Sequence, residues 1–518
     1  MSLISSRRIG PATSSAGRPH TGPTLIALGL LAFASCSVIG DGERSSNPSP
    51  TIIPTGSPTT NADGTSSPPL PSDPPTSAAW ASIGPDSPIE HVVFIVKENR
   101  SFNHYFATYP GAVGSTTGAT LRCDADRCEP GRTVELTEAP DVLPHDLVHC
   151  FLCGAVAIDG GRMDGFNRMN GLRPLNPADD VDELGYDLSG YTHLTREAIP
   201  NYWRYADRFV LADHFFTSMF GPTFPEHLFT VAASSNLIVG NKVAKSEPGS
   251  YCDDETEVAP RFREGLTEEQ IARVMFLEEH ITEDPSYFEE IRSMWDDYKL
   301  CFDIEVLPDL LERAGVSWKY YVTENAWNNA LQAIRHIRFG PMWERVQPPA
   351  AFLEDLRNGD LPQVSWLVPP SLYDEHPGNG KSTCAGENWT VQQLNALMRS
   401  DHWRTTVAVV VWDDFEGFYD PVPPPHPDIM GMGPRTPALI VSPYSRQGRN
   451  PLGGSVDHTT YEFSSVLHFI ELLHGLPPMT ERDAVADPLS GALDFAHPNF
   501  DRLILPLRTD CPYALGLA

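Results

Sequence analysis

A short apolar run that ends abruptly in polar residues constrains the fold of this chain more than any other feature. Residues 92–96 read VVFIV, which is too short for a helix and apolar enough for a strand buried on both faces. The run stops in Lys97, Glu98 and Asn99. Open α/β sheets build ligand or metal sites at the carboxyl ends of such strands, although ordinary buried strands also end in polar residues. The neighbouring motifs therefore decide whether Glu98 and Asn99 belong to a site.

A second apolar run repeats this design further along the chain. Residues 406–412 read TVAVVVW and lead directly into Asp413 and Asp414. Adjacent side chains on a regular strand point to opposite faces, so both carboxylates reach one ion only where the pleat breaks up at a strand end. Oxygen ligands from Glu98, Asn99, Asp413 and Asp414 would suit a divalent cation. We therefore expect a metal site where the two strand ends meet.

Strands and helices alternate along most of the chain, which predicts an α/β fold with a mainly parallel sheet covered on both faces. Residues 199–233 predict a helix, a short extended piece, a Gly-Pro-Thr turn and a second helix. The remaining predicted strands are 317–322, 363–368, 405–412 and 437–441, and the remaining predicted helices lie near 350–357, 391–399 and 460–473.

Three further residues have side chains suited to phosphate chemistry. Thr223 follows Gly221-Pro222 at the predicted start of a helix, where a hydroxyl is usually an N-cap but is also well placed as a nucleophile. His145 stands beside an aspartate, and His376 follows two acidic residues after the predicted strand 363–368. Both histidines could bind phosphate or act as general acids, and polar surface loops would also explain them.

The charge balance argues against one class of partner. The 518 residues include 37 Lys plus Arg and 68 Asp plus Glu. No basic surplus is available to neutralise nucleic-acid phosphates, so nucleic acid is not expected as a partner. A phosphate-bearing substrate would need a local cation, and a divalent metal would supply that charge.

The N-terminal region predicts export. Arg7, Arg8 and Arg18 precede an apolar run, 25–34, that is too short to span a bilayer, so 1–36 is predicted to be a signal peptide. The small residues before Cys36 resemble the lipobox of bacterial lipoproteins, which predicts a lipid anchor to the membrane at Cys36. Residues 37–88 are rich in Pro, Ser and Thr and are expected to form a disordered tether, followed by one catalytic domain over 89–518.

The cysteine count agrees with an oxidising compartment. Without Cys36, eight of the nine cysteines remain, which suits four disulfides. Cys123 with Cys128 and Cys150 with Cys153 are close enough to pair, although these four could instead form one zinc site. Residues 251–301 form a charged, helix-rich block that we expect to be a surface insertion closed by its terminal cysteines.

Five motifs together resemble the phosphoesterase family that holds the bacterial non-specific phospholipases C and the related secreted acid phosphatases. The resemblance implies an alkaline-phosphatase-like three-layer α/β sandwich and the cleavage of phosphate esters through a covalent phospho-enzyme. The motifs occur in the family's order and are Glu98-Asn99-Arg100-Ser101-Phe102, Gly221-Pro222-Thr223, Glu375-His376-Pro377, residues 412–420 and Asp457-His458-Thr459.

The same resemblance implies roles for individual residues. Thr223 matches the nucleophile, and His145 and His376 match histidines that bind the phosphoryl group or protonate the leaving oxygen. The residues that match the surroundings of the divalent metal are Glu98, Asn99, Asp413, Asp414 and Thr223.

The chain also departs from the family pattern. Asn103 stands where Asp is common, Pro421 replaces a histidine, and Phe224-Pro225-Glu226-His227 replaces the usual Asp-Pro-Asn-Arg. These changes affect which substrate we expect the enzyme to prefer. Ser218 is a second candidate nucleophile besides Thr223. We therefore expect an exported phospholipase C acting on phosphatidylcholine-like lipids, with two alternatives: a broad acid phosphatase acting on small phosphate esters, and a surface lipoprotein that serves as a binding module.

Overall fold

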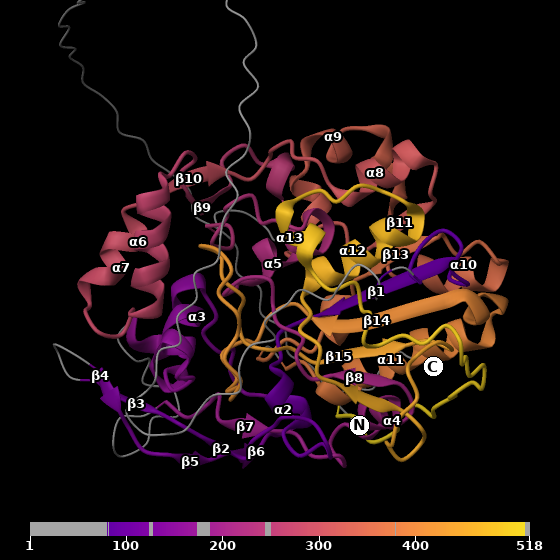
Figure 1. Ribbon diagram of the computed structural model, residues 1–518, viewed down its shortest axis with the longest axis horizontal. Helices are drawn as coiled ribbons and strands as arrows, with labels where there is room; N and C mark the ends of the chain where they lie inside the picture. The colour runs from indigo at the N-terminus through magenta and orange to yellow at the C-terminus, as the bar shows by residue number, and fades with distance from the viewer. Residues whose placement is uncertain are drawn as a thin grey trace, which may run out of the picture. The chain divides into compact units, whose positions relative to one another are not determined.

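A mixed sheet of eight strands forms the centre of the computed structural model, which describes residues 80, 82–123, 128–172, 187–243, 250–378 and 380–512 (Figure 1). The strand order is β12-β11-β13-β1-β14-β15-β8-β16. These strands are β1 (His91–Lys97), β8 (Val210–Ala212), β11 (Trp318–Tyr321), β12 (Val346–Gln347), β13 (Val364–Leu367), β14 (Thr406–Trp412), β15 (Ala438–Val441) and β16 (Ser455–Asp457).

The sheet is mainly parallel, as the alternation of elements predicts. The two strands with long apolar runs, β1 and β14, are neighbours at its centre and pair in parallel over their full length. Strand β15 differs, because it runs antiparallel to both β14 and β8. No helix lies between β14 and β15, so the chain does not cross back over the sheet and returns in the opposite direction.

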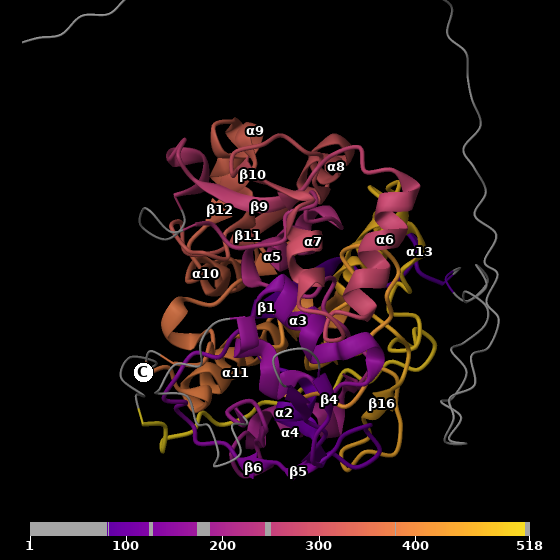
Figure 2. The same cartoon turned by 90° about the vertical axis from the view of Figure 1, so that its left-hand side faces the viewer.

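Helices cover both faces of the sheet, and the alternation of side chains along β1 shows how. Val92, Phe94 and Val96 belong to one apolar core, whereas Val93 and Ile95 belong to the other. The first core is completed by α3 (Phe151–Ile158), α5 (Thr223–Ala232), α8 (Leu307–Ala314) and α12 (Phe463–His474), and the second by α2 (Phe102–Phe106), α4 (Pro200–Arg208), α10 (Ala351–Asn358) and α11 (Thr383–Arg399) (Figures 1 and 2).

Helix α11 is eight residues longer than the prediction that starts it at residue 391. It begins after Ser382, whose hydroxyl accepts a hydrogen bond from the backbone N–H of Ala385 and so caps the helix. Its first turns bury Glu387, Asn388 and Thr390. Because these buried residues are polar, the apolar periodicity that identifies a helix is missing from this half.

The block 251–301 lies to one side of the sheet and contains more strand than expected (Figure 1). Two helices, α6 (Glu268–Glu279) and α7 (Ser286–Arg292), are flanked by β9 (Val258–Phe262) and β10 (Trp295–Lys299), which pair antiparallel. The other short elements are β2 (Thr117–Gly118), β3 (Leu121–Cys123), β4 (Cys128–Pro130), β5 (Val134–Glu135), β6 (Thr137–Glu138), β7 (Thr192–His193), α9 (Arg335–Arg338) and α13 (Glu481–Val485).

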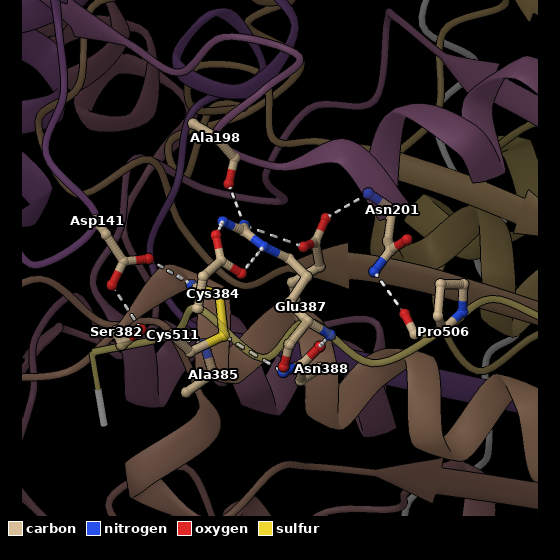
Figure 3. The surroundings of a disulfide bond; sticks show 12 residues. Asp141, Ala198, Asn201, Ser382, Cys384, Ala385, Glu387, Asn388, Pro506 and Cys511 are labelled. Carbon is tan, nitrogen blue, oxygen red and sulfur yellow. Dashed lines mark hydrogen bonds and ion pairs between the residues drawn. A yellow bond between two sulfur atoms is a disulfide. The ribbon is translucent and has the colours of Figure 1, made fainter. Parts of the chain in front are cut away.

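Four disulfides cross-link the described part of the chain. Cys123–Cys128, Cys150–Cys153 and Cys252–Cys301 confirm the expected pairs, and they leave no free thiolates for the alternative zinc site. The fourth bond, Cys384–Cys511, joins the C-terminal segment to the start of α11 (Figure 3). There the carboxylate of Asp141 accepts hydrogen bonds from the backbone N–H of Cys384 at 2.7 Å and from the hydroxyl of Ser382 at 2.6 Å.

The predicted signal peptide, Cys36 and residues 37–79 of the predicted tether lie outside the described residues. The packed region includes residues before 89, because Ile83 is buried and the rings of Trp80 and His468 lie 5.0 Å apart. Within the described ranges, none of the helices combines the length and the apolar character that a membrane span requires.

Candidate active site

The ends of strands β1 and β14 meet at one edge of the sheet. Lys97 pairs with Trp412, so the residues that follow the two strands start side by side. The backbone N–H of Asn99 donates to Asp413 Oδ1 at 2.9 Å, and Asn99 Nδ2 donates to Asp414 Oδ1 at 2.8 Å. The structure therefore brings together the amide and the two carboxylates that the sequence predicts at one site, although 315 positions separate Asn99 from Asp414.

A left-handed turn lets the β1 end face the carboxylates. Asn99 has a φ of +55°, a conformation that few side chains other than Asn and Asp tolerate. The next residue, Arg100, donates its backbone N–H to the carbonyl of Asp414 at 2.8 Å, and its Nη1 to the carbonyl of Asn99 at 2.9 Å. The bond to Asp414 continues the contact between the two strand ends after the regular pairing has stopped, and the bond to Asn99 braces the turn at the end of β1.

Thr223 lies at the start of helix α5, as predicted, and faces the same region. It is the first residue of the helix and, together with Glu98, His149, Asp374 and His376, it lines a cavity of about 940 Å³. The helix N-terminus carries partial positive charge from its unpaired N–H groups, which favours an anion beside Thr223. The cavity therefore places a hydroxyl, two predicted site residues and a helix N-terminus around one space.

The alternative nucleophile, Ser218, is placed differently. Its side chain is fully buried and its Oγ accepts a hydrogen bond from the backbone N–H of Phe463 at 3.2 Å. It is not among the residues that line the 940 Å³ cavity. The hydroxyl of Ser218 thus has a structural partner, and the cavity is lined by Thr223 instead.

His227, which the sequence analysis did not select, lies between the two strand ends. It follows Thr223 by one helical turn, so both side chains project from the same face of α5. Its Nε2 lies 3.4 Å from Glu98 Oε1 and 3.5 Å from Asp413 Oδ2. One atom from each of Glu98, His227 and Asp413 lies within 4.8 Å of the others, a spacing that could hold a metal ion.

Two histidines that line the cavity, His149 and His376, lie close to the buried carboxylate of Glu416. His149 Nδ1 is 3.3 Å from Glu416 Oε2, and His376 Nε2 is 3.8 Å from the same oxygen. His376 Nδ1 also lies 2.8 Å from the carbonyl of Pro377, which suits a proton on Nδ1. The ring of His376 can then present Nε2 to the cavity.

His145 is placed elsewhere. It is exposed and lines a separate hollow of about 40 Å³ with Asp187 and Gly417, while the neighbouring Asp146 lines both this hollow and the main cavity. Of the two predicted histidines, the structure therefore brings only His376 to the cavity that Thr223 lines. The role of His145 stays a prediction.

The predicted motif at Asp457-His458-Thr459 forms a group of its own. His458 Nδ1 and His214 Nδ1 lie 2.8 Å and 2.7 Å from the same oxygen of Asp213. Asp457 accepts hydrogen bonds from the backbone and hydroxyl of Thr459 at the end of β16. None of these residues lines the main cavity.

Burial and mutual repulsion raise the pKa values of several acids in the site. Burial, with the charge of Asp413 adding to it, raises the pKa of Asp414 to about 7, and burial beside Asp146 raises the pKa of Glu416 well above its usual range. Burial lowers the pKa of His227, but the carboxylates of Asp413 and Glu98 outweigh burial and raise it to about 9. These buried acids therefore hold their protons more strongly than exposed carboxyl groups do, unless a positive charge joins them.

The donor atoms left over in the site fit a divalent cation. Asn99 Oδ1, Asp413 Oδ2 and Asp414 Oδ2 are buried and have no hydrogen-bond partner among the described residues. Buried carboxylate oxygens without partners are costly, and hard oxygen donors of this kind are what divalent cations bind. The residues that were predicted to surround a metal therefore fit that group.

Four residues of the site were not predicted from the sequence. His227 could have been found by extending one helical turn from Thr223, and Glu416 and His149 stand within a few residues of predicted positions. Asn328, whose Nδ2 donates to Glu98 Oε1 at 2.6 Å, lies in a loop that carries no recognisable signal.

Comparisons with known proteins agree with this geometry. The model of the Phosphoesterase family matches residues 89–477. Phospholipase C B of Mycobacterium tuberculosis is 27% identical over 474 residues, which cover 79% of this chain and 78% of that protein. Non-hemolytic phospholipase C of Pseudomonas aeruginosa is 25% identical over 79% of this chain and 58% of that protein, and non-specific phospholipase C6 of Arabidopsis thaliana is 24% identical over 85% and 77%. The chain therefore belongs to the Phosphoesterase family and is a hydrolase that acts on phosphoester bonds.

Proposed function

We propose that this protein is an exported, metal-dependent phosphodiesterase of the phospholipase C type, which works through a phospho-threonine at Thr223. The observation that carries the proposal is the hydrogen-bonded contact of Asn99 with Asp413 and Asp414, together with a cavity that is lined by both Thr223 and Glu98, the residue before Asn99. Helices on both faces of a mainly parallel sheet support the alkaline-phosphatase-like sandwich that the five motifs imply. Export rests on residues 1–36, with Cys36 as the lipid anchor.

Glu98, Asn99, Asp413, Asp414 and Thr223 are the residues that would hold the divalent cation. When bound, such a cation neutralises negative charge that develops on phosphoryl oxygens and lowers the pKa of a hydroxyl in contact with it. The side chains keep this position fixed, because Asn99 is hydrogen-bonded to both aspartates.

Thr223 is the nucleophile in this proposal. The Thr223 hydroxyl gives up its proton to solvent, and its Oγ1 forms a bond to phosphorus while the bond from phosphorus to the leaving alcohol breaks. The leaving oxygen takes a proton from a histidine. Water then attacks phosphorus, releases the phosphorylated head group and restores the hydroxyl of Thr223. The N-terminus of α5 favours the negative charge on the phosphoryl group in both steps.

The two histidines on the cavity wall differ in protonation. Burial lowers the pKa of His149, but the charges of Asp414 and Asp146 outweigh burial and raise it, so this imidazole is suited to donate a proton. Burial and the neighbouring His149 lower the pKa of His376, which suits hydrogen bonding as a neutral imidazole. We assign the leaving-group acid to His149 and phosphoryl binding to His376, in preference to the exposed His145.

The residues that line the cavity are suited to bind a cationic lipid head group. Asp146 and Asp374 contribute carboxylates, with Lys381 Nζ 2.8 Å from Asp374 Oδ2, and Trp327 contributes an aromatic ring. Carboxylates and aromatic faces attract quaternary ammonium groups. Together with the phospholipase C names of three relatives, this wall favours choline- or ethanolamine-bearing lipids over simple monoesters.

Two measurements on the purified protein test the proposal. Thr223→Ala is expected to lower kcat by at least about 10³-fold on phosphatidylcholine, whereas Ser218→Ala is expected to retain most activity, with thermal unfolding confirming that both fold. Comparison of p-nitrophenyl phosphorylcholine with p-nitrophenyl phosphate separates the substrates. A faster monoester would establish the acid phosphatase instead, and an active Thr223→Ala protein would remove the nucleophile assignment.

A further inference from the structure

His227, a fully buried histidine beside the strand ends, has no hydrogen-bond partner in the part of the chain that the structure describes. The side chain of His227 has 0% exposure, and neither Nδ1 nor Nε2 forms a hydrogen bond within the described structure. Each nitrogen of an imidazole carries either an N–H donor or a lone pair that can accept a hydrogen bond. Burying both nitrogens without a partner is therefore unfavourable. A bound ion or ligand that pairs with the imidazole would explain why a histidine is tolerated at this buried position.

The surroundings of Nε2 identify the kind of partner. Glu98 Oε1 lies 3.4 Å from Nε2 and Asp413 Oδ2 lies 3.5 Å from it, and Asp413 Oδ2 also lacks a hydrogen-bond partner. These separations are longer than a charge-assisted hydrogen bond. They are close to the roughly 3.4 Å that separates two donor atoms when both bind one ion at ~2.1 Å with tetrahedral angles.

We propose that His227 Nε2 is a nitrogen ligand of the metal, so that the site combines imidazole nitrogen with carboxylate and amide oxygens. This inference rests on the proposed function, because it concerns the same cation. Imidazole suits zinc, copper, iron and nickel, whereas magnesium, calcium and manganese prefer oxygen ligands. We therefore expect zinc or a transition metal that accepts imidazole in this site, with His227 favouring it over magnesium and calcium.

The position of His227 on α5 would also fix the metal relative to Thr223. Thr223 and His227 project from one face of the same helix, one turn apart. An ion held by His227 is thereby fixed relative to the hydroxyl of Thr223 by a rigid helical turn. The nitrogen ligand thus orients the nucleophile as well as selecting the metal.

Metal affinity measured on the mature protein tests the inference without reference to turnover. Equilibrium dialysis of the metal-free protein is expected to show Zn²⁺ binding at least ~10³-fold tighter than Mg²⁺. His227→Ala is expected to weaken Zn²⁺ binding by ~100-fold and to change Mg²⁺ binding by less than ~3-fold. His468→Gln, which alters another buried histidine, is the matched control and should change neither affinity. With Co²⁺ as a probe, the visible absorption of the parent should change in His227→Ala alone.

Two results would overturn the inference in different ways. If the parent binds Zn²⁺ and Mg²⁺ within ~10-fold of each other, or if His227→Ala binds Zn²⁺ as the parent does, His227 serves only as a positively charged partner of the carboxylates. The proposed function then still stands, provided that Asp414→Asn weakens the binding of every metal. If neither the parent nor any variant binds a divalent metal, the proposed function fails together with the inference.

Discussion

Lys97 Nζ lies 2.6 Å from Glu375 Oε1 beneath the active site, and both side chains have 0% exposure. Each residue immediately precedes a site residue, since Glu98 follows Lys97 and His376 follows Glu375. The pair therefore fixes the end of β1 relative to the loop that carries His376. The remaining hydrogen-bonding capacity of the two groups is used by Tyr105, Tyr202, Gly386, Thr390 and Trp412.

Replacing Lys97 by Met should destabilise the protein by about 3–5 kcal/mol, because the carboxylate of Glu375 would remain buried without its cation. Urea unfolding followed by circular dichroism measures this loss. Lys319→Met is the control: Lys319 also pairs with a carboxylate, that of Asp355, but is partly exposed, so a loss of no more than about 1 kcal/mol is expected. Equal losses of unfolding free energy in the two variants would show that the buried pair contributes no more to stability than the partly exposed pair.

Removing divalent metal should abolish activity and lower Tm, because the carboxylates at the two strand ends would then repel one another. Ligand linkage predicts a stabilisation of about 3–4 kcal/mol when metal is present at 100–1,000 times its Kd. Asp414→Asn should reduce the difference in Tm between the metal-loaded and the metal-free protein, because it removes one of the repelling charges. Differential scanning calorimetry with and without a chelator provides both values. An unchanged Tm and full activity after chelation would contradict a bound metal.

The histidine assignments give a third prediction. His149→Ala and His376→Ala should each lower kcat by about 10²–10⁴-fold, because each side chain lines the cavity beside Thr223. His145→Ala should change kcat by less than ~3-fold, because His145 lies outside that cavity. For His149, an activated substrate with a p-nitrophenol leaving group should recover much of the lost rate, since that leaving group needs no proton. If His145→Ala lowered kcat as much as His149→Ala does, the catalytic role would return to His145, as predicted from the sequence.

The meeting of the two strand ends could largely be predicted from the sequence, because local signals were enough. Glu98, Asn99, Asp413 and Asp414 each follow a long apolar run, and strands with such runs pair at the centre of a parallel sheet. Thr223 was predicted from its turn and helix start. Each of these predictions needs only the position of one residue relative to its own strand or helix.

The rest of the site depends on contacts between distant elements. His227 reaches the strand ends only because α5 packs on the sheet, where Trp366 Nε1 donates to the carbonyl of Thr230 at 2.8 Å. Asn328 contacts Glu98 from a loop after β11. Neither contact leaves a periodic pattern in the sequence. The antiparallel direction of β15 was missed for the same reason, since strand direction is set by the length and path of the connection.

The buried carboxyl of Glu471 should make stability fall as pH rises. It lies near the end of α12 with 1% exposure, and burial, with the charge of Asp483 adding to it, raises its pKa to about 9. The folded protein therefore keeps a proton on Glu471 between about pH 4.5 and 9, whereas the unfolded chain releases it, so this contribution is largest below pH 4.5 and is lost toward pH 9. Glu471→Gln should leave Tm nearly unchanged at pH 4.5 and raise it by about 2–5 °C at pH 8. The exposed Glu481 supplies the control, because Glu481→Gln should shift Tm equally at both pH values. A Glu471→Gln protein that unfolds at the parent's temperature at pH 8 would show that this carboxyl is already ionised in the folded state.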